Sequence, residues 1–184
     1  WDGAGVVTCT VQSGELSRWQ PRDAAVQQPR FVPDGARVWV DDASGWLNVR
    51  IDGESVLAES AAQAGPTWGM GQRSFVVSPD CSHVALCRNE GGFGRLVVVD
   101  RSSGRVTNVG KGGHGQLTWV GDTLVALRSG AVTPTQIVAY DLSDLSVKPA
   151  RTVLAVGPAA GWDQFELPEP SVIEVDGLHA RRYA

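Results

Sequence analysis

One pattern occurs three times in this chain, as FVPDGARVWV (31–40), FVVSPDCSHVALC (75–87) and LTWVGDTLVAL (117–127). Each copy joins an apolar run to a turn that contains an aspartate, and the third copy is degenerate. The three aspartates, Asp34, Asp80 and Asp122, are separated by 46 and 42 residues. A recurrence at this period indicates a repeat architecture in which each unit is one supersecondary element.

A second marker follows each of these aspartates after 18 to 20 residues. It is an apolar run that ends in an aspartate and continues into a Gly- or Ser-bearing turn: LNVRIDGES (47–55), RLVVVDRSSGR (95–105) and QIVAYDLSDLS (136–146). Asp52, Asp100 and Asp141 mark the three copies, and VTCTVQSGEL (7–16) is interpreted as an earlier one. We expect these aspartates to cap turns, because an Asx side chain hydrogen-bonds nearby backbone. A carboxylate set for chemistry is the alternative interpretation.

The apolar residues in each unit predict four short strands. They alternate or run continuously for four to eight positions between turn residues, without a sustained helical period. The expected strands are 29–33, 36–42, 47–52 and 55–59, then 73–78, 83–89, 95–100 and 105–110, then 116–120, 123–128, 136–141 and 147–154. Four antiparallel strands repeated every 40 to 50 residues or so are typical of β-propeller blades. An immunoglobulin-like sandwich has similar strand spacing but gives no reason for one turn to recur.

These units define the expected organisation. The chain is predicted to be all-β, a partial β-propeller of four-stranded antiparallel blades with about three and a half blades. The predicted segments are half a blade at 1–20, blades at 21–60, 61–110 and 111–154, an interdomain linker at 155–170, and a hairpin at 171–184. The linker contains Pro158, Pro168 and Pro170, which cannot donate to a strand ladder. Asp176 and Gly177 are a strong two-residue hairpin signal.

The composition argues against several classes of protein. The 184 residues hold 16 Lys and Arg against 20 Asp and Glu, a net charge of −4, and the basic residues are scattered along the sequence. A cationic cluster, which drives nonspecific nucleic-acid binding, is not evident. No run approaches the length of about 18 apolar residues that marks a membrane span. We therefore expect neither a nucleic-acid partner nor membrane association.

The three cysteines predict a reducing compartment. Cys9, Cys81 and Cys87 are an odd number, whereas a disulfide framework has an even number in a small secreted chain. We interpret them as reduced thiols of a cytoplasmic protein. Cys81, His83 and Cys87 are closely spaced but lack the second pair of ligands that closes a tetrahedral site. No metal and no cofactor are expected.

An open fan of blades predicts partners. Each blade needs a neighbour on both faces, and a bare apolar face is an aggregation liability. Because the chain starts at Trp1 within a strand-like stretch, we expect it to be a fragment. The missing blades would then come from the rest of the polypeptide or from another chain. Self-association into a homo-oligomer is a further way to cover the faces.

Three stretches carry a resemblance to a known family: PRFVPDGARVWVDDASGWLNVRIDG (29–53), AGPTWGMGQRSFVVSPD (64–80) and PSVIEVDGLHARRYA (170–184). In this order they resemble the later propeller blades, and the entry into the hydrolase domain, of the prolyl oligopeptidase family of serine peptidases. The branch is that of acylaminoacyl peptidases and actinobacterial aminopeptidases. The matching positions are Pro33, Asp34, Gly35, Ser44, Gly45, Trp46 and Asn48, then Pro66, Trp68, Gly71 and Phe75. Val120-Gly121-Asp122 and Leu47 depart from the family pattern.

The resemblance implies a serine peptidase in which this chain gates access. The whole enzyme would cleave short peptides or aminoacyl amides near their N-terminus through a Ser-His-Asp acyl-enzyme mechanism. The family's G-x-S-x-G elbow is absent from these 184 residues, so no catalytic residue is assigned here. By the resemblance, the hairpin at 171–184 would be the truncated first hairpin of an α/β-hydrolase domain whose catalytic residues lie beyond Ala184. The propeller would exclude folded proteins by size.

Other motifs have simpler explanations than catalysis. His83, His114 and His179 are the available bases, but none accompanies a serine in a strand-to-helix elbow. KGGHGQ (111–116) is glycine-rich, yet it lacks the Lys-Ser/Thr ending of a phosphate-binding loop. We interpret it as the crossover between two blades.

The candidate substrate-binding residues are Trp68, Gln72 and Arg73, just before an expected innermost strand. In a propeller, such crossovers form one rim of the central channel. The tryptophan offers a flat apolar wall, the glutamine an adaptable amide, and the arginine a fork suited to carboxylate or carbonyl oxygens. The alternative is that Trp68 packs between blades and Arg73 forms an interdomain ion pair.

Two other functions remain open. One is a non-catalytic propeller that binds partner proteins, in which the hairpin after 170 would close a last blade. The other is a small-molecule-binding or periplasmic propeller, which requires an upstream signal peptide. The sequence beyond residue 184 distinguishes them, since only a peptidase needs an oxyanion segment followed by G-x-S-x-G.

Overall fold

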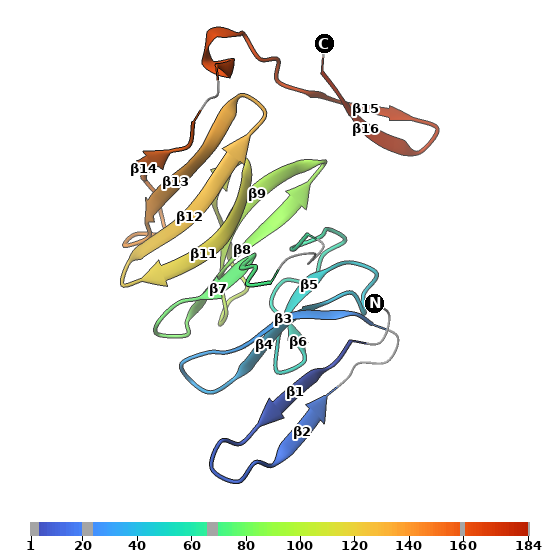
Figure 1. Cartoon of the computed structure of the whole chain (residues 1–184), viewed down its shortest axis with the longest axis vertical. Coiled ribbons are helices and arrows are strands. Elements are labelled where there is room, and N and C mark those ends of the chain that lie inside the picture. The colour runs from blue at the N-terminus through green and yellow to red at the C-terminus, as the bar shows by residue number, and fades with distance from the viewer. Residues whose placement is uncertain (1–3, 20–23, 66–69, 159–160, 184) are drawn as a thin grey trace. The chain divides into compact units, whose positions relative to one another are not determined.

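The computed structural model describes residues 4–19, 24–65, 70–158 and 161–183. The chain divides into two compact units, residues 1–72 and 73–184, which are described separately. Within the described ranges, the regular structure consists of antiparallel strands and one short 3-10 helix, η1 (Trp162–Gln164) (Figure 1). No helix in those ranges is long and apolar enough to cross a membrane.

The first unit contains a two-stranded and a four-stranded sheet. The strands are β1 (Val6–Cys9) and β2 (Leu16–Trp19), then β3 (Val26–Phe31), β4 (Arg37–Asp41), β5 (Asn48–Ile51) and β6 (Glu54–Ser55). The four-stranded sheet is a meander in chain order. Its central strands are buried through Val38, Val40 and Val49, and Trp39 packs against Trp19 of β2 with 4.2 Å between ring centroids.

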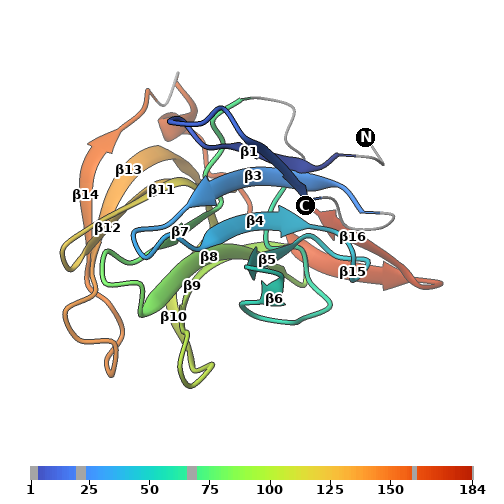
Figure 2. The ribbon, with the colours of Figure 1, turned by 90° about the horizontal axis from the view of Figure 1, so that it is seen from below.

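The second unit contains two four-stranded meanders. The strands are β7 (Phe75–Val77), β8 (His83–Glu90), β9 (Phe93–Asp100) and β10 (Val106–Lys111), then β11 (Gly113–Val120), β12 (Thr123–Gly130), β13 (Thr133–Asp141) and β14 (Arg151–Val156). Each sheet has its strands in chain order. The two sheets lie side by side like neighbouring blades (Figure 2). The expected all-β, four-stranded blades of a partial propeller are therefore confirmed.

One apolar cluster joins the two blades of the second unit. Its buried members come from both sheets: Ala85, Leu96, Val98 and Val109, then Leu117, Leu124, Ala126, Val138, Tyr140 and Leu142. Burial of each Leu or Val side chain contributes about 1.5 to 3 kcal/mol, so this interface holds the blades together. The backbone N–H of Leu117 in β11 also donates to the carbonyl of Arg73, 3.0 Å away, just before β7. The first strands of the two blades are thus connected directly.

Strand bounds differ from the expected ones in several places: β14 begins four residues later than expected, β6 ends four residues earlier, and the first strand of two blades begins early. β3 begins at Val26 and β11 at Gly113, each three residues before the expected start. Both strands carry a bulge at a glutamine with positive φ, at Gln28 (55°) and Gln116 (53°), where the pairing register shifts. The sequence analysis placed a strand boundary where the structure has a bulge, because a bulge breaks the alternation of side chains without ending the strand.

The turn aspartates behave as expected at two of three positions. Asp100 Oδ1 accepts bonds from the backbone N–H groups of Ser102 and Ser103, and Asp141 Oδ1 accepts one from Ser143. Asp52 differs, since its carboxylate accepts from the backbone N–H of Arg37 on a neighbouring strand, 3.1 Å away. Capping is therefore local after β9 and β13 and cross-strand after β5.

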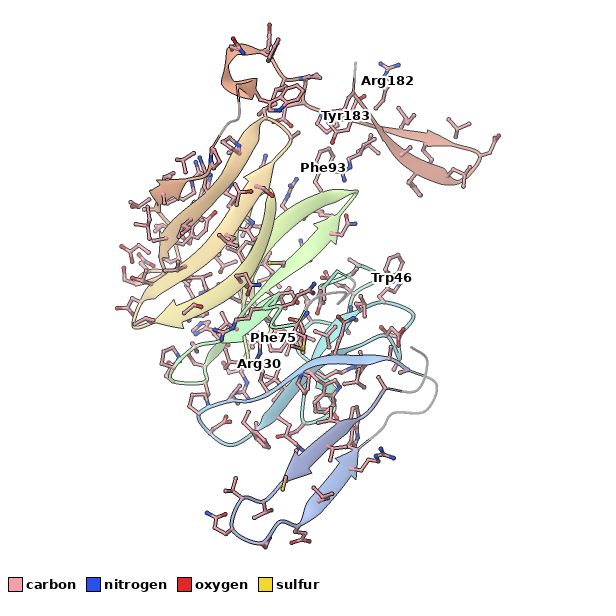
Figure 3. The ribbon with its side chains drawn as sticks, in the orientation of Figure 1. Arg30, Trp46, Phe75, Phe93, Arg182 and Tyr183 are labelled. Carbon is pink, nitrogen blue, oxygen red and sulfur yellow. The ribbon has the colours of Figure 1, made fainter. Side chains whose placement is uncertain are left out.

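The predicted hairpin at the end of the chain is present. β15 (Ser171–Val175) pairs with β16 (Leu178–Arg182), and Val175 lies opposite Leu178. The turn residues Asp176 and Gly177 both have positive φ, 51° and 77°, as a type I′ turn requires. The guanidinium of Arg181 lies 5.7 Å from the ring centroid of Phe93. Phe93 lies at the β8–β9 turn (Figure 3).

Candidate functional site

The predicted rim lies where the two compact units meet along the chain. Trp68 falls outside the described residues. The backbone carbonyl of Gln72 accepts a hydrogen bond from the Arg30 guanidinium, and the carbonyl of Arg73 accepts from Leu117 at 3.0 Å. These bonds fix the backbone at both positions. The Gln72 side chain is half-buried and the Arg73 side chain is exposed. A role of the three residues in substrate binding therefore stays a prediction.

A serine, a histidine and an aspartate lie together at the start of β8. Ser82 Oγ lies 2.7 Å from Nδ1 of His83, whose Nε2 lies 3.8 Å from Oδ2 of Asp100. The antiparallel pairing of β8 with β9, which sets His83 opposite Asp100, creates this arrangement. The sequence did not predict this group, because Ser82 does not lie in a strand-to-helix elbow and Asp100 is 17 residues away from His83 in the chain.

Hydrogen bonding makes this group a turn rather than a nucleophilic triad. The single hydroxyl proton of Ser82 goes to Oδ2 of Asp80, 2.7 Å away. His83 must then donate from Nδ1, so it cannot accept the serine proton as a base does. The backbone N–H of Ser82 is also taken, since it donates to Oδ1 of Asp80 at 3.1 Å. Hydrogen bonds from Ser78 and Ser82 hold the pKa of Asp80 well below its usual range.

The three cysteines are free thiols with different surroundings. Cys87 lies on β8, and its Sγ donates to the carbonyl of His114, 3.1 Å away. Burial raises the pKa of the Cys87 thiol to about 12, so it stays protonated and unreactive at neutral pH. Within the described part of the chain, no three His, Cys, Asp or Glu side chains are grouped so that they could hold a metal ion.

A histidine and a tyrosine of the β11–β14 blade form a polar pair on the side that faces the other blade of the second unit. His114 Nδ1 lies 2.9 Å from the carbonyl of Gly112, and His114 Nε2 lies 2.8 Å from the hydroxyl of Tyr140. A carbonyl only accepts, so the imidazole proton sits on Nδ1 and Nε2 accepts from the tyrosine. Burial is the main cause that lowers the pKa of His114 to about 4, and burial raises the pKa of Tyr140. Both groups are neutral at physiological pH.

The KGGHGQ stretch that holds His114 is the predicted crossover. β10 ends at Lys111 and β11 begins at Gly113, so Gly112 alone connects the blades. Gly112 has a φ of 102°, which favours glycine. A Cβ built on Gly110 would lie 2.5 Å from the Tyr140 hydroxyl oxygen, so glycine is also needed for this close approach. Glycine is thus required at Gly112 for the backbone conformation and at Gly110, just before the stretch, for packing.

Comparison with solved structures identifies the fold. A puromycin hydrolase has a TM-score of 0.75 and 19% sequence identity, over 100% of this chain and 29% of that chain. The chain therefore shares its fold with part of that protein. A puromycin-hydrolysing peptidase from Mycobacterium tuberculosis gives the same TM-score, 0.75, at 19% identity, over 100% of this chain and 29% of its own. Prolyl oligopeptidase B from Galerina marginata gives 0.62 at 12% identity, over 98% of this chain and 26% of its own.

These comparisons confirm, at the level of fold, the resemblance to the prolyl oligopeptidase family. The chain spans under a third of the length of the two puromycin-hydrolysing proteins. No family model matches the sequence, and no curated protein matches it either. The likeness is therefore one of fold, and it extends over the whole of this chain.

Proposed function

We propose that this chain is the propeller portion of a serine peptidase that hydrolyses short peptides or aminoacyl amides at their N-terminal end. The observation that carries the proposal is the fold match over all of the chain, including the hairpin after the last blade, to two puromycin-hydrolysing proteins. The serine nucleophile and its partners would belong to an α/β-hydrolase domain outside residues 1–184. The three free cysteines support a cytoplasmic location.

The propeller would select substrates by size. Blades bound together by a continuous apolar interface, as in the second unit, make a rigid wall. A rigid wall admits small amides to a chamber and excludes folded proteins. The serine of the hydrolase domain would first be acylated by the substrate, and water from the chamber would then hydrolyse the acyl-enzyme.

Hydrolysis tests the proposal. The complete protein should release the amino acid from puromycin and from aminoacyl-nitroanilides, and an active-serine phosphonate should label one serine outside residues 1–184. The 184-residue chain alone should not be labelled, because the serine most nearly poised for reaction, Ser82, gives its proton to Asp80. Labelling of a serine within 1–184, or a complete protein that neither hydrolyses these amides nor reacts with the phosphonate, would contradict the proposal.

The rim residues give this proposal a finer form, in which Trp68, Gln72 and Arg73 contact the substrate. The exposed guanidinium of Arg73 on a fixed backbone supports it. In the complete enzyme, Arg73→Ala should raise KM by about 10- to 100-fold, which is the loss of one charge-assisted hydrogen bond. The kcat value should stay nearly constant if the bond is equally strong in the ground and transition states.

Steady-state kinetics and thermal melts measure this effect together. Arg18→Ala, at an exposed arginine of β2, is the matched control and should change neither KM nor the melting temperature. If Arg73→Ala lowers only the melting temperature and leaves both kinetic constants unchanged, then Arg73 is structural and the rim assignment is wrong.

A further inference from the structure

The blades of the second unit enclose a groove of about 980 Å³. One wall is β10 with the ends of β8 and β9 that meet at their hairpin. The other wall comes from β12, β13 and the start of β14. The charged side chains along it are Arg88, Glu90, Arg95, Lys111, Arg128, Lys148 and Arg151. Six cationic side chains therefore share one groove in a chain whose net charge is −4.

Only one end of this groove is neutralised by its own residues. Glu90, the one carboxylate among the described residues that line it, lies 3.0 Å from Arg88 and 3.7 Å from Arg95. Lys111, Arg128, Lys148 and Arg151 are left with no carboxylate in the described lining. Like charges held close together repel, so an anion that enters the groove gains from four cations at once.

Two of these cations are oriented by the fold. Arg128 donates from Nε to the carbonyl of Lys111, 3.0 Å away, and lies 3.4 Å from Oε1 of Gln136. Arg151 lies opposite Tyr140 in the pairing of β13 with β14. Burial is the main cause of the lowered pKa of His114, and the positive charges of both arginines lower it further. Their field therefore reaches the floor of the groove.

The floor of the groove is rigid. Tyr140 is almost fully buried, and its hydroxyl lies against Gly110 so closely that there is no room for a side chain at that position. The tyrosine is fixed by its bond to His114. A pre-formed groove costs little reorganisation when a ligand binds.

We propose that this groove binds a small polyanion, a molecule with two or more phosphate or carboxylate groups. The volume lies at the upper end of small-molecule sites, about 300 to 1,000 Å³, and the arginine fork matches the oxygens of either group. The lining comes from both blades, so the ligand would bridge them.

Calorimetry of the complete protein at constant ionic strength tests the site. Tripolyphosphate and citrate are the two probes, and tighter binding of one of them identifies the phosphate or the carboxylate source. We expect saturable binding with one site per chain for at least one probe. Lys148→Gln and Arg151→Gln should each weaken it about tenfold, because each removes one charge-assisted contact. The melting temperature should rise with probe concentration, since only the folded groove binds.

The matched control is Arg18→Gln, which removes the same charge from the other unit. It should leave the affinity for the probe unchanged. Two variants are used because Arg151 also lies against Tyr140, whereas Lys148 is exposed on the loop before β14. Absence of saturable binding for both probes would overturn the proposal, as would an affinity that is insensitive to Lys148→Gln and Arg151→Gln or equally sensitive to Arg18→Gln.

Discussion

Replacing Asp41 with alanine should destabilise the first unit by about 3 to 5 kcal/mol. The carboxylate is 2% exposed and accepts three hydrogen bonds: from Trp39 Nε1 at 2.8 Å, from Arg50 Nε at 3.2 Å and from the backbone N–H of Ala43 at 3.2 Å. Removing it leaves the Arg50 guanidinium, whose side chain is 18% exposed, without this partner. An uncompensated charge and an unsatisfied indole N–H then remain in a desolvated place.

Hydrogen exchange of the amides in β4 and β5 is the appropriate measurement. A protein with several domains does not unfold in one step, and exchange reports the local free energy of opening directly. Asp41→Asn should cost less, because its amide oxygen still accepts one of the bonds. The double variant Asp41→Ala, Arg50→Met should recover part of the loss, because it removes the stranded charge. A cost of Asp41→Ala below about 1 kcal/mol, as for an exposed ion pair, would contradict the prediction.

The second large effect is a pH dependence that originates at His114. Its pKa is lowered from 6.5 to about 4 in the folded chain, chiefly by burial. The unfolded chain therefore binds a proton more readily than the folded one between these values. The free energy of unfolding is therefore at its full value above pH 6.5. It decreases as the pH falls toward 4, by up to about 3 kcal/mol.

His114→Gln should remove this slope while the amide keeps a polar group near Tyr140. Exchange of the β11 and β13 amides, measured from pH 7 to 4, compares the variant with the native protein. The turn aspartates do not confuse this window, because hydrogen bonds from nearby serines hold the pKa values of Asp80 and Asp100 below their ordinary range. An equal slope in the variant would show that another group is responsible.

The repeat of turns and apolar runs was sufficient to predict blades. Leu96 and Val98 of the LVVVD run at 96–100 are buried against the neighbouring blade of the second unit, and Asp100 caps the turn that follows. The bulges at Gln28 and Gln116 were not predictable, since a single residue with positive φ carries no periodic signal. Strand existence was therefore clearer in the sequence than strand length.

The groups that gather in space were the least predictable. The six cations of the groove are spread from Arg88 to Arg151, and the sequence analysis described basic residues as scattered. Antiparallel pairing brings them to one groove, because each blade returns its chain to the same edge. The bond between His114 and Tyr140 likewise joins two strands of one blade, β11 and β13, at positions 26 residues apart, which local patterns do not encode.

The single residue between β10 and β11 limits how far the two blades of the second unit can move relative to each other. One residue spans at most about 3.6 Å, so the chain at Gly112 has no slack for one blade to slide past the other. The 19 residues between β6 and β7 form a longer link, yet Gln63 within it is buried and its amide oxygen accepts from the backbone N–H of Val49 in β5, 2.8 Å away. Lengthening the link at Gly112 should therefore uncouple two sheets that now behave as one mechanical part.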